Sequence, residues 1–233
     1  MDFPQLHDWD LTPEQAIALQ RQLADQVRLC GPPLNEIRSV AGVDVSCRWQ
    51  GTRFHAAVVV LSFPQLQPLE VATASRDGGF PYIPGLLSFR ELPVVLEACA
   101  KLRHAPDLLL VDGQGIAHPR RFGLASHLGL WLNLPSIGCA KSRLFGEHGE
   151  VGERRGEAAP LRAPDGEEIG VLLRTRDRVK PLYVSPGHLL AIEQAGKLVL
   201  ACGGRYRLPE PTRLAHQASN RQRVTDEQRL RDD

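Results

Sequence analysis

Several features are missing from this sequence, and each absence excludes a class of protein. No stretch reaches the roughly 18 consecutive apolar residues that a membrane-spanning helix requires, and the first residues lack the basic and then apolar pattern of a secretory signal peptide. The five cysteines are odd in number and have no Cys-x-x-Cys spacing, which disfavours structural zinc and a disulfide framework. We therefore expect reduced thiols, no membrane partner and a cytoplasmic location.

An excess of charge of one sign is also missing. The net charge of +1 gives the chain no overall attraction to nucleic acid. Lysine is scarce, and nearly all basic residues are arginine. Arginine offers a planar, bidentate fit to phosphate, although a GC-rich coding sequence explains the same excess. Local clusters of basic residues are therefore more informative than their total.

What is present suffices for one globular core. The chain has 233 residues, of which 42% are apolar and 24% charged, as in ordinary soluble domains. We see no internal repeat, low-complexity tract or interior linker. We therefore expect a single domain over residues 1–233, with a strongly charged end that frays after about residue 220.

Local patterns predict an α/β fold. The wholly apolar run Leu108–Val111 is typical of a strand buried on both faces. Three earlier strands with short connections indicate an antiparallel meander. The other elements follow from periodicity and turn signals: strands at 39–47, 54–63, 69–75, 135–140, 169–175 and 181–185, a loop or ragged hairpin at 147–168, and helices at 11–29, 86–102, 124–132, from Pro186 to about Leu200, and from Leu214 onward.

Three acidic residues and one histidine are candidates for a metal site. Asp44 interrupts a strand, where Asp is disfavoured, and Asp112 ends the Leu108–Val111 strand before a glycine turn, where open α/β sheets place ligands. Carboxylates suit Mg²⁺ or Mn²⁺, which polarise a phosphoryl oxygen and generate hydroxide from water. Simpler interpretations are solvated aspartates and, for Glu91, a capping box with Ser88. His216 lies near the start of the last helix.

Two further segments suit a nucleic acid. Lys141 follows a short strand, so its ammonium group could reach a phosphate near Asp112 or simply pair with an acid. Prolines stiffen the segment Pro81-Tyr82-Ile83-Pro84, and glycines flank it. Such a loop could wedge its Tyr and Ile into a stack of bases, or it could pack on the core.

Together these motifs resemble endonuclease V, the deoxyinosine-specific nuclease family of DNA repair. The resemblance extends from about Val40 to His216 and is most specific in the segments 81–91 (PYIPGLLSFRE), 111–115 (VDGQG) and 118–127 (HPRRFGLASH). It implies a ribonuclease-H-like fold, in which helices flank a central mixed sheet of three antiparallel strands followed by parallel strands. Gln114 is a departure, because relatives often have His there.

The resemblance also assigns roles to individual residues. It implies that Asp44 and Asp112 bind the metal, that Glu91 is a third acid, that His216 is the catalytic histidine and that Lys141 lies near the scissile phosphate. It implies a strand-separating wedge and a lesion pocket. The wedge residues are Pro81, Tyr82, Ile83 and Pro84, and the pocket residues are Gly85, Leu87, Gly113, His118, Gly123 and Leu144.

The activity implied is hydrolysis of the second phosphodiester bond 3′ to deoxyinosine, with Mg²⁺ or a substituting Mn²⁺, leaving 3′-hydroxyl and 5′-phosphate ends. A glycine-lined pocket can read the flipped base, because backbone N–H groups donate to the carbonyl of inosine and reject the amine of adenine. We expect a monomer whose partner is DNA containing deoxyinosine. The alternatives are a nuclease acting on inosine in RNA and a catalytically inactive protein that only binds the lesion.

Overall fold

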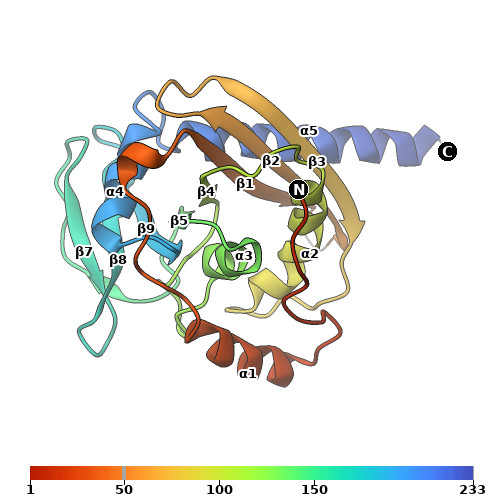
Figure 1. The fold of residues 1–233 in the computed structure, drawn as a ribbon, viewed down its shortest axis with the longest axis horizontal. Helices are drawn as coiled ribbons and strands as arrows, with labels where there is room; N and C mark the ends of the chain where they lie inside the picture. The colour runs from red at the N-terminus through yellow and green to blue at the C-terminus, as the bar shows by residue number, and fades with distance from the viewer. Residues whose placement is uncertain (49–50, 233) are drawn as a thin grey trace.

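The computed structural model describes residues 1–48 and 51–232, and one mixed sheet organises them (Figure 1). The strand order is β3-β2-β1-β4-β5-β9-β8-β7-β6. The strands are β1 (Ser39–Cys47), β2 (Arg53–Ser62), β3 (Pro68–Asp77), β4 (Leu108–Val111), β5 (Ser136–Ala140), β6 (Glu147–His148), β7 (Ala158–Arg162), β8 (Glu168–Leu173) and β9 (Leu182–His188).

Helices cover both faces of this sheet. They are α1 (Pro13–Ala24), α2 (Leu87–Ala100), α3 (Leu124–Leu132), α4 (Ile192–Ala201) and α5 (Glu210–Asp232), with a 3₁₀ turn at Leu34–Glu36. The capping box predicted for α1 is present, because Thr12 and Gln15 each bond the backbone of the other. No helix in the described ranges is long and apolar enough to cross a membrane.

The topology confirms the predicted fold. Strands β1, β2 and β3 form an antiparallel meander, and β4 and β5 continue from β1 in parallel. Beyond β5 the sheet turns antiparallel again through β9, β8, β7 and β6. The segment predicted as a ragged hairpin therefore supplies the far edge of the sheet.

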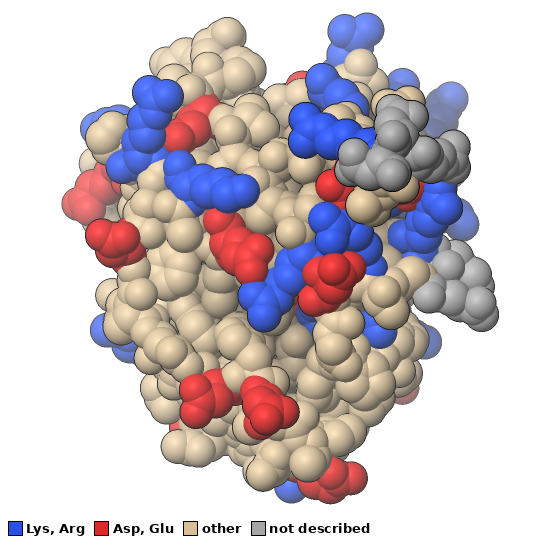
Figure 2. Space-filling view, turned by 90° about the vertical axis from the view of Figure 1, so that its right-hand side faces the viewer, with Lys and Arg blue, Asp and Glu red and all other residues tan. Residues whose placement is uncertain are grey.

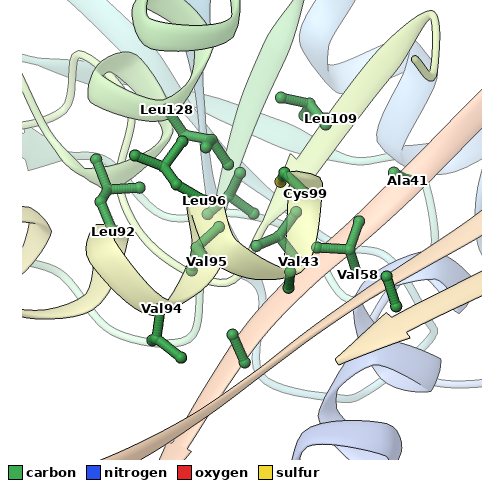
Figure 3. Packing of buried hydrophobic residues seen from close by; sticks show 14 of the residues in the cluster. Ala41, Val43, Val58, Leu92, Val94, Val95, Leu96, Cys99, Leu109 and Leu128 are labelled. Atoms are coloured by element: carbon green, nitrogen blue, oxygen red, sulfur yellow. The ribbon is translucent and has the colours of Figure 1, made fainter. Parts of the chain in front are cut away.

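The sheet has one apolar layer on each face, and different helices pack on each of them. Side chains of α2 and α3 pack on Ala41 and Val43 of β1 and on Leu109 of β4 (Figure 3). Side chains of α4 and α5 pack on the opposite face, against Val40 and Leu110 among others. Alternation along a strand then decides where the acids point. Asp44 and Asp112 are an even number of residues from Val40 and Leu110, and so they lie on the side of α5.

Gly42 allows α5 to lie directly on β1. A Cβ atom at this position would lie 1.9 Å from the carbonyl oxygen of Pro211, at the start of α5. Any larger residue would push the helix outward. The close approach therefore fixes the height of α5 above the strand that carries Asp44.

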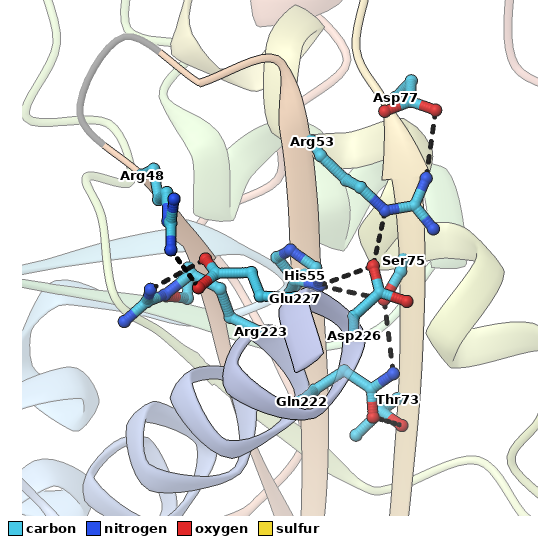
Figure 4. Close-up of polar contacts among 11 residues, drawn as sticks. Arg48, Arg53, His55, Thr73, Ser75, Asp77, Gln222, Arg223, Asp226 and Glu227 are labelled. Atoms are coloured by element: carbon cyan, nitrogen blue, oxygen red, sulfur yellow. Dashed lines mark hydrogen bonds and ion pairs between the residues drawn. The ribbon is translucent and has the colours of Figure 1, made fainter. Parts of the chain in front are cut away.

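The charged end of α5 remains helical to Asp232, although the sequence favoured fraying after about residue 220. Ion pairs tie this part of the helix to the meander (Figure 4). Arg53 on β2 lies 2.5 Å from Asp226, and Arg48 lies 2.6 Å from Glu227. Gln222 adds hydrogen bonds to Thr73 and Ser75 on β3. These contacts are tertiary, so the local composition gave no sign of them.

Three local predictions were wrong. Helix α2 begins at Leu87, follows Leu86 without a side-chain cap and contains Pro93, so Ser88 and Glu91 form no capping box. Residues 186–188, predicted to open a helix, belong to β9, and α4 starts only at Ile192. Pairing of Pro186 with Ile137 of β5 outweighs the local turn signal. Helix α5 starts at Glu210 rather than Leu214.

Candidate active site

Asp44 and Asp112 meet at the ends of two neighbouring parallel strands. Val43 of β1 is in register with Val111 of β4, so the residues that follow lie side by side. The Asp112 N–H donates to the Val43 carbonyl at 3.0 Å, which extends the ladder by one bond. One ligand atom each from Asp44, Asp112 and His216 lies within 4.8 Å of the others. The structure thus brings together three of the residues that the sequence singled out.

Two side chains of helix α5 contact the Asp44 carboxylate. His216 Nδ1 lies 3.3 Å from Asp44 Oδ2, and the buried Ser219 hydroxyl donates to the same oxygen at 2.6 Å. His216 and Ser219 are three residues apart and so share one face of the helix. On the other side of the imidazole, Asn220 Nδ2 lies 3.3 Å from His216 Nε2. Sequence reasoning missed Ser219, although its spacing from His216 is a usable signal.

Glu91 on α2 lies near enough to Asp44 and Asp112 for their charges to act on it, although it is not part of the three-residue cluster. Burial, followed by the negative charges of Asp44 and Asp112, raises the pKa of Glu91 to about 8. Burial also raises the pKa of Asp44 to about 6; the Ser219 hydrogen bond opposes this rise, and the charge of Asp112 adds to it. The charge of Asp112 therefore disfavours ionisation of both Asp44 and Glu91. A bound cation would relieve this repulsion.

Lys141 is placed against the same carboxylates. It directly follows β5, the strand beside β4, and its ammonium group forms an ion pair with Asp112 Oδ2. Arg207 fixes the local backbone by donating to the Lys141 carbonyl at 2.9 Å. The ion pair confirms that Lys141 pairs with an acid, whereas its contact with a phosphate stays a prediction.

The donor set fits a hard divalent cation. Asp44 and Asp112 offer carboxylate oxygens from two rigid strands, and Mg²⁺ is usually held by one or two carboxylates together with substrate phosphate. Imidazole nitrogen is a ligand more typical of softer metals. The two aspartates are therefore the residues that could hold Mg²⁺, and His216 is better suited to orienting Asp44 or to proton transfer.

A separate cavity of about 120 Å³ lies beside this site. Its volume approaches that of a cavity able to hold one aromatic ring, about 150 Å³. The lining residues are Gln20, Tyr82, Ile83, Pro84, Gly85, Leu87, Ser88, Gln114, His118, Gly123, Leu124 and Leu144. Eight of these twelve were predicted for the wedge or the pocket, and the segment 82–87 contributes to both features.

Two predicted residues lie outside this cavity. Gly113 is absent from its lining, and a Cβ atom there would lie 3.1 Å from Leu124. Pro81 lines a neighbouring cavity of about 430 Å³ with Trp9 and Phe80. The four lining residues that were not predicted for the pocket are Gln20, Ser88, Gln114 and Leu124. They come from separate elements, so only the fold brings them together.

His118 braces the pocket rather than presenting polar atoms to it. The Gly85 carbonyl accepts hydrogen bonds from Gln20 Nε2 at 3.0 Å, His118 Nε2 at 3.0 Å and Arg120 Nη2 at 2.8 Å. His118 Nδ1 in turn accepts from the Arg120 N–H. Gly85 has φ +81°, a left-handed conformation that favours glycine. The turn that starts the pocket is therefore rigidly held.

Comparisons with known proteins agree with this geometry. The family model described as endonuclease V matches residues 21–217. The endonuclease V of Nostoc sp. is 52% identical over 95% of this chain and 100% of its own. The crystal structure of endonuclease V from Streptomyces avermitilis has a TM-score of 0.87 at 43% identity, covering 94% of this chain and 96% of its own.

A further similar structure contains nucleic acid. Endonuclease V of Ciona intestinalis, crystallised with a 24-mer DNA containing an inosine followed by a ribo-adenosine, has a TM-score of 0.79 at 27% identity and covers 90% of this chain and 96% of its own. Fold, site and comparisons define a nuclease of ribonuclease-H-like architecture, a hydrolase that acts on DNA. The chain belongs to the endonuclease V family.

Proposed function

We propose that this nuclease recognises deoxyinosine in DNA and hydrolyses the second phosphodiester bond 3′ to it. The products would carry a 3′-hydroxyl and a 5′-phosphate, and Mg²⁺ would be the cofactor, with Mn²⁺ able to replace it. One observation supports this most directly. The segment 112–114 places an acidic residue of the metal site two positions from Gln114, which lines the neighbouring cavity.

The start of α2 provides the chemistry for reading the base. Because no side chain of the described residues caps this helix, the N–H groups of its first turn, at Leu87 and Ser88, remain available beside the pocket that both residues line. They can donate to the carbonyl at position 6 of hypoxanthine. Adenine carries an amino group there, which is itself a donor, so it would leave these groups unpaired.

The acidic site provides the chemistry for cleavage. A divalent ion bound there supplies Lewis-acid polarisation of a phosphoryl oxygen. Asp44 and Asp112 hold the position for the ion, and the Ser219 hydrogen bond keeps Asp44 in one orientation. His216 is placed to move a proton beside Asp44. The Lys141 ammonium group can leave Asp112 for the negatively charged phosphate.

Separation of the two sites suits cleavage away from the lesion. The pocket holds one base, while the carboxylates lie beside the backbone further along the strand. The exposed Tyr82, with 70% of its surface accessible, stands at the pocket and can fill the gap that the flipped base leaves in the helix. The base itself undergoes no reaction, so no nucleophile is needed inside the pocket.

The surface charge suits local contact with a nucleic acid rather than general attraction. In Figure 2, Lys and Arg gather in the upper half of the face on which α5 ends, with acids among them, and Asp and Glu are prominent in the lower half, at the level of α1. With a net charge of +1, nonspecific affinity should be weak and sensitive to salt. Our proposal includes a monomeric enzyme in the cytoplasm.

Inosine in RNA is the second candidate substrate, because the Ciona relative was crystallised with inosine next to a ribonucleotide. Inactivity is disfavoured, since Asp44, Glu91, Asp112 and His216 are all present. The test is nicking of matched DNA and RNA duplexes that carry inosine or adenine at one position, with Mg²⁺ and with chelator. We expect Mg²⁺-dependent nicks in inosine DNA at the second 3′ phosphodiester. Equal nicking of the adenine control would overturn the proposal.

A further inference from the structure

A buried chain of hydrogen bonds leads away from the base pocket through two histidines. Ser88 lines the pocket and is only 3% exposed. Its hydroxyl lies 3.0 Å from His127 Nδ1, and His127 Nε2 lies 2.7 Å from His7 Nε2. At the far end, His7 Nδ1 lies 2.7 Å from the carbonyl oxygen of Asp8. The chain therefore joins the pocket to the segment before α1.

The last member of this chain determines the direction of every proton in it. A carbonyl oxygen can only accept, so His7 Nδ1 must carry a hydrogen. A neutral imidazole has a single N–H group, so His7 Nε2 accepts and His127 Nε2 donates. His127 Nδ1 must then accept, and the Ser88 hydroxyl donates to it.

The surroundings keep both histidines neutral. His127 is fully buried, and the rings of Trp9, Phe89 and Trp131 surround the pair. Burial lowers the pKa of His7, and burial together with the charge of His7 lowers that of His127. If His7 were protonated it would donate from both nitrogens, and the direction of the whole chain would reverse. In the neutral state the Ser88 proton points away from the pocket.

The Ser88 side chain therefore presents an acceptor to the pocket, next to the backbone N–H donors of Leu87 and Ser88. Its hydroxyl offers the pocket only oxygen lone pairs. Gln114 shows a related pattern, since its Nε2 donates to the Ser142 carbonyl at 3.0 Å while its Oε1 has no partner among the described residues. A ligand seated here would need an N–H group on its edge.

We propose that Ser88 determines specificity by accepting a hydrogen bond from the N1–H group of inosine, and that His127 and His7 are positioning residues that stop its hydroxyl from donating. This rests on the proposed function. Position 1 of hypoxanthine carries a hydrogen, whereas position 1 of adenine carries a lone pair. Adenine would set that lone pair against the lone pairs of Ser88, and both would stay unpaired in a buried pocket. Position 1 is thus read in addition to position 6.

The first test removes the acceptor. Wild type and Ser88→Ala are compared on DNA containing deoxyinosine or deoxynebularine, whose purine base has a lone pair in place of the N1–H group and a hydrogen in place of the carbonyl at position 6. Wild type should cut deoxyinosine at least about tenfold better, as kcat/KM, than deoxynebularine. Ser88→Ala should lose about tenfold on deoxyinosine and change less than about twofold on deoxynebularine, which has no N1–H group for Ser88 to accept from. An unchanged preference in Ser88→Ala would overturn the proposal.

The second test keeps the Ser88 oxygen but removes the constraint on the direction of its O–H group. His7→Phe removes the partner that fixes the His127 tautomer, so the Ser88 hydroxyl can turn and donate to adenine. We expect cleavage of adenine DNA relative to deoxyinosine DNA to rise at least about threefold, with deoxyinosine cleavage nearly unchanged. The exposed His104→Phe is the matched control and should keep the wild-type ratio. Damage to the fold would lower both rates without raising the ratio.

The two levels of failure can be told apart. If the wild-type enzyme shows no preference for deoxyinosine over adenine, the proposed function fails. If that preference is present and Ser88→Ala and His7→Phe both keep the wild-type ratios, the function stands and the role of Ser88 is wrong.

Discussion

Two acidic side chains in the active site ionise less readily than they would in water. Glu91 and Asp44 have raised pKa values, because burial and neighbouring carboxylates both oppose their negative charge. Acids with such perturbed pKa values are frequent at functional sites. The repulsion should therefore be measurable in the metal-free protein.

We predict that metal-free protein loses stability as pH rises, partly through Glu91. The native Glu91 keeps its proton to about pH 8, whereas the unfolded chain releases it near 4.5. Between these values the native state binds more protons, so the free energy of unfolding falls with rising pH. The contribution is complete below about 4.5 and is lost as pH passes about 8.

Glu91→Gln provides the comparison, because an amide has no proton to lose. Its free energy of unfolding, measured with denaturant in chelator from about pH 5 to about pH 8, should fall less steeply than that of wild type. Added Mg²⁺ should reduce the wild-type slope, since a cation favours the ionised acid. Parallel slopes for the two proteins in chelator would show that Glu91 is not perturbed.

At this scale the sequence was informative where a residue type contradicts its local context. Asp44 lies inside a strand and Asp112 before a glycine turn, and a functional site explains both unusual placements. The resemblance then assigned roles to Glu91, Lys141 and His216. Ser219 and Ser88 fit their helices without conflict. Their importance depends on the partners that the fold places beside them, Asp44 for Ser219 and His127 for Ser88. Local sequence patterns cannot predict those partners.

Among the elements, α5 makes the largest contribution to the active site. It lies on β1 because Gly42 lets the two backbones touch, and it delivers His216 and Ser219 to Asp44. Ion pairs at its far end hold it across the meander. Its position is therefore determined at both ends.

We predict that Gly42→Ala lowers both activity and stability. The new Cβ atom would lie 1.9 Å from the Pro211 carbonyl, so α5 must move outward. Overpacking of this kind typically costs about 1–3 kcal/mol, and misplacement of His216 and Ser219 should lower kcat about 100-fold. Thermal melting and single-turnover cleavage measure the two effects.

The control is Gly204→Ala. A Cβ atom at Gly204 would have no described atom within 4 Å, so both melting temperature and cleavage rate should stay at wild-type values. If Gly42→Ala also kept the wild-type cleavage rate, close contact between α5 and β1 would not be what positions the site.

The loop that contains Tyr82 is the second functional element. With 70% of its surface exposed, Tyr82 stabilises little of the fold. Tyr82→Ala should therefore leave the melting temperature unchanged and weaken binding to deoxyinosine DNA by roughly 1–3 kcal/mol, the value of one stacking contact. Leu69→Ala, an exposed apolar residue on β3, serves as control. Equal affinities of all three proteins would make this loop merely structural.

Periodic elements were predictable, and their boundaries were less so. The bounds of β1, β4 and α3 match the sequence-based ranges, because apolar runs and stripes define them. Pro186-Gly187-His188 looked like a helix start, yet pairing with β5 holds it in β9. Ser88 looked like a cap, yet its hydroxyl is engaged by His127. In both cases a tertiary contact outweighed a local preference.

For the whole molecule, sheet topology is what creates the site. Parallel pairing of β1 with β4 sets the two aspartates side by side, β5 adds Lys141, and the helices on opposite faces contribute Glu91 and His216. The order of the strands was predictable only through the family resemblance. Residues 44, 91, 112 and 216 are too far apart in the chain for spacing to show that they meet.

The central claim is that these carboxylates serve cleavage while a separate pocket serves recognition. The most direct test compares wild type, Asp112→Ala and the exposed control Asp165→Ala on deoxyinosine DNA with Mg²⁺. Lost metal stabilisation of several kcal/mol predicts that Asp112→Ala cuts about 1,000-fold more slowly or worse, whereas its preference for binding deoxyinosine over adenine DNA should persist. Wild-type cleavage by Asp112→Ala, or loss of that binding preference, would contradict the claim.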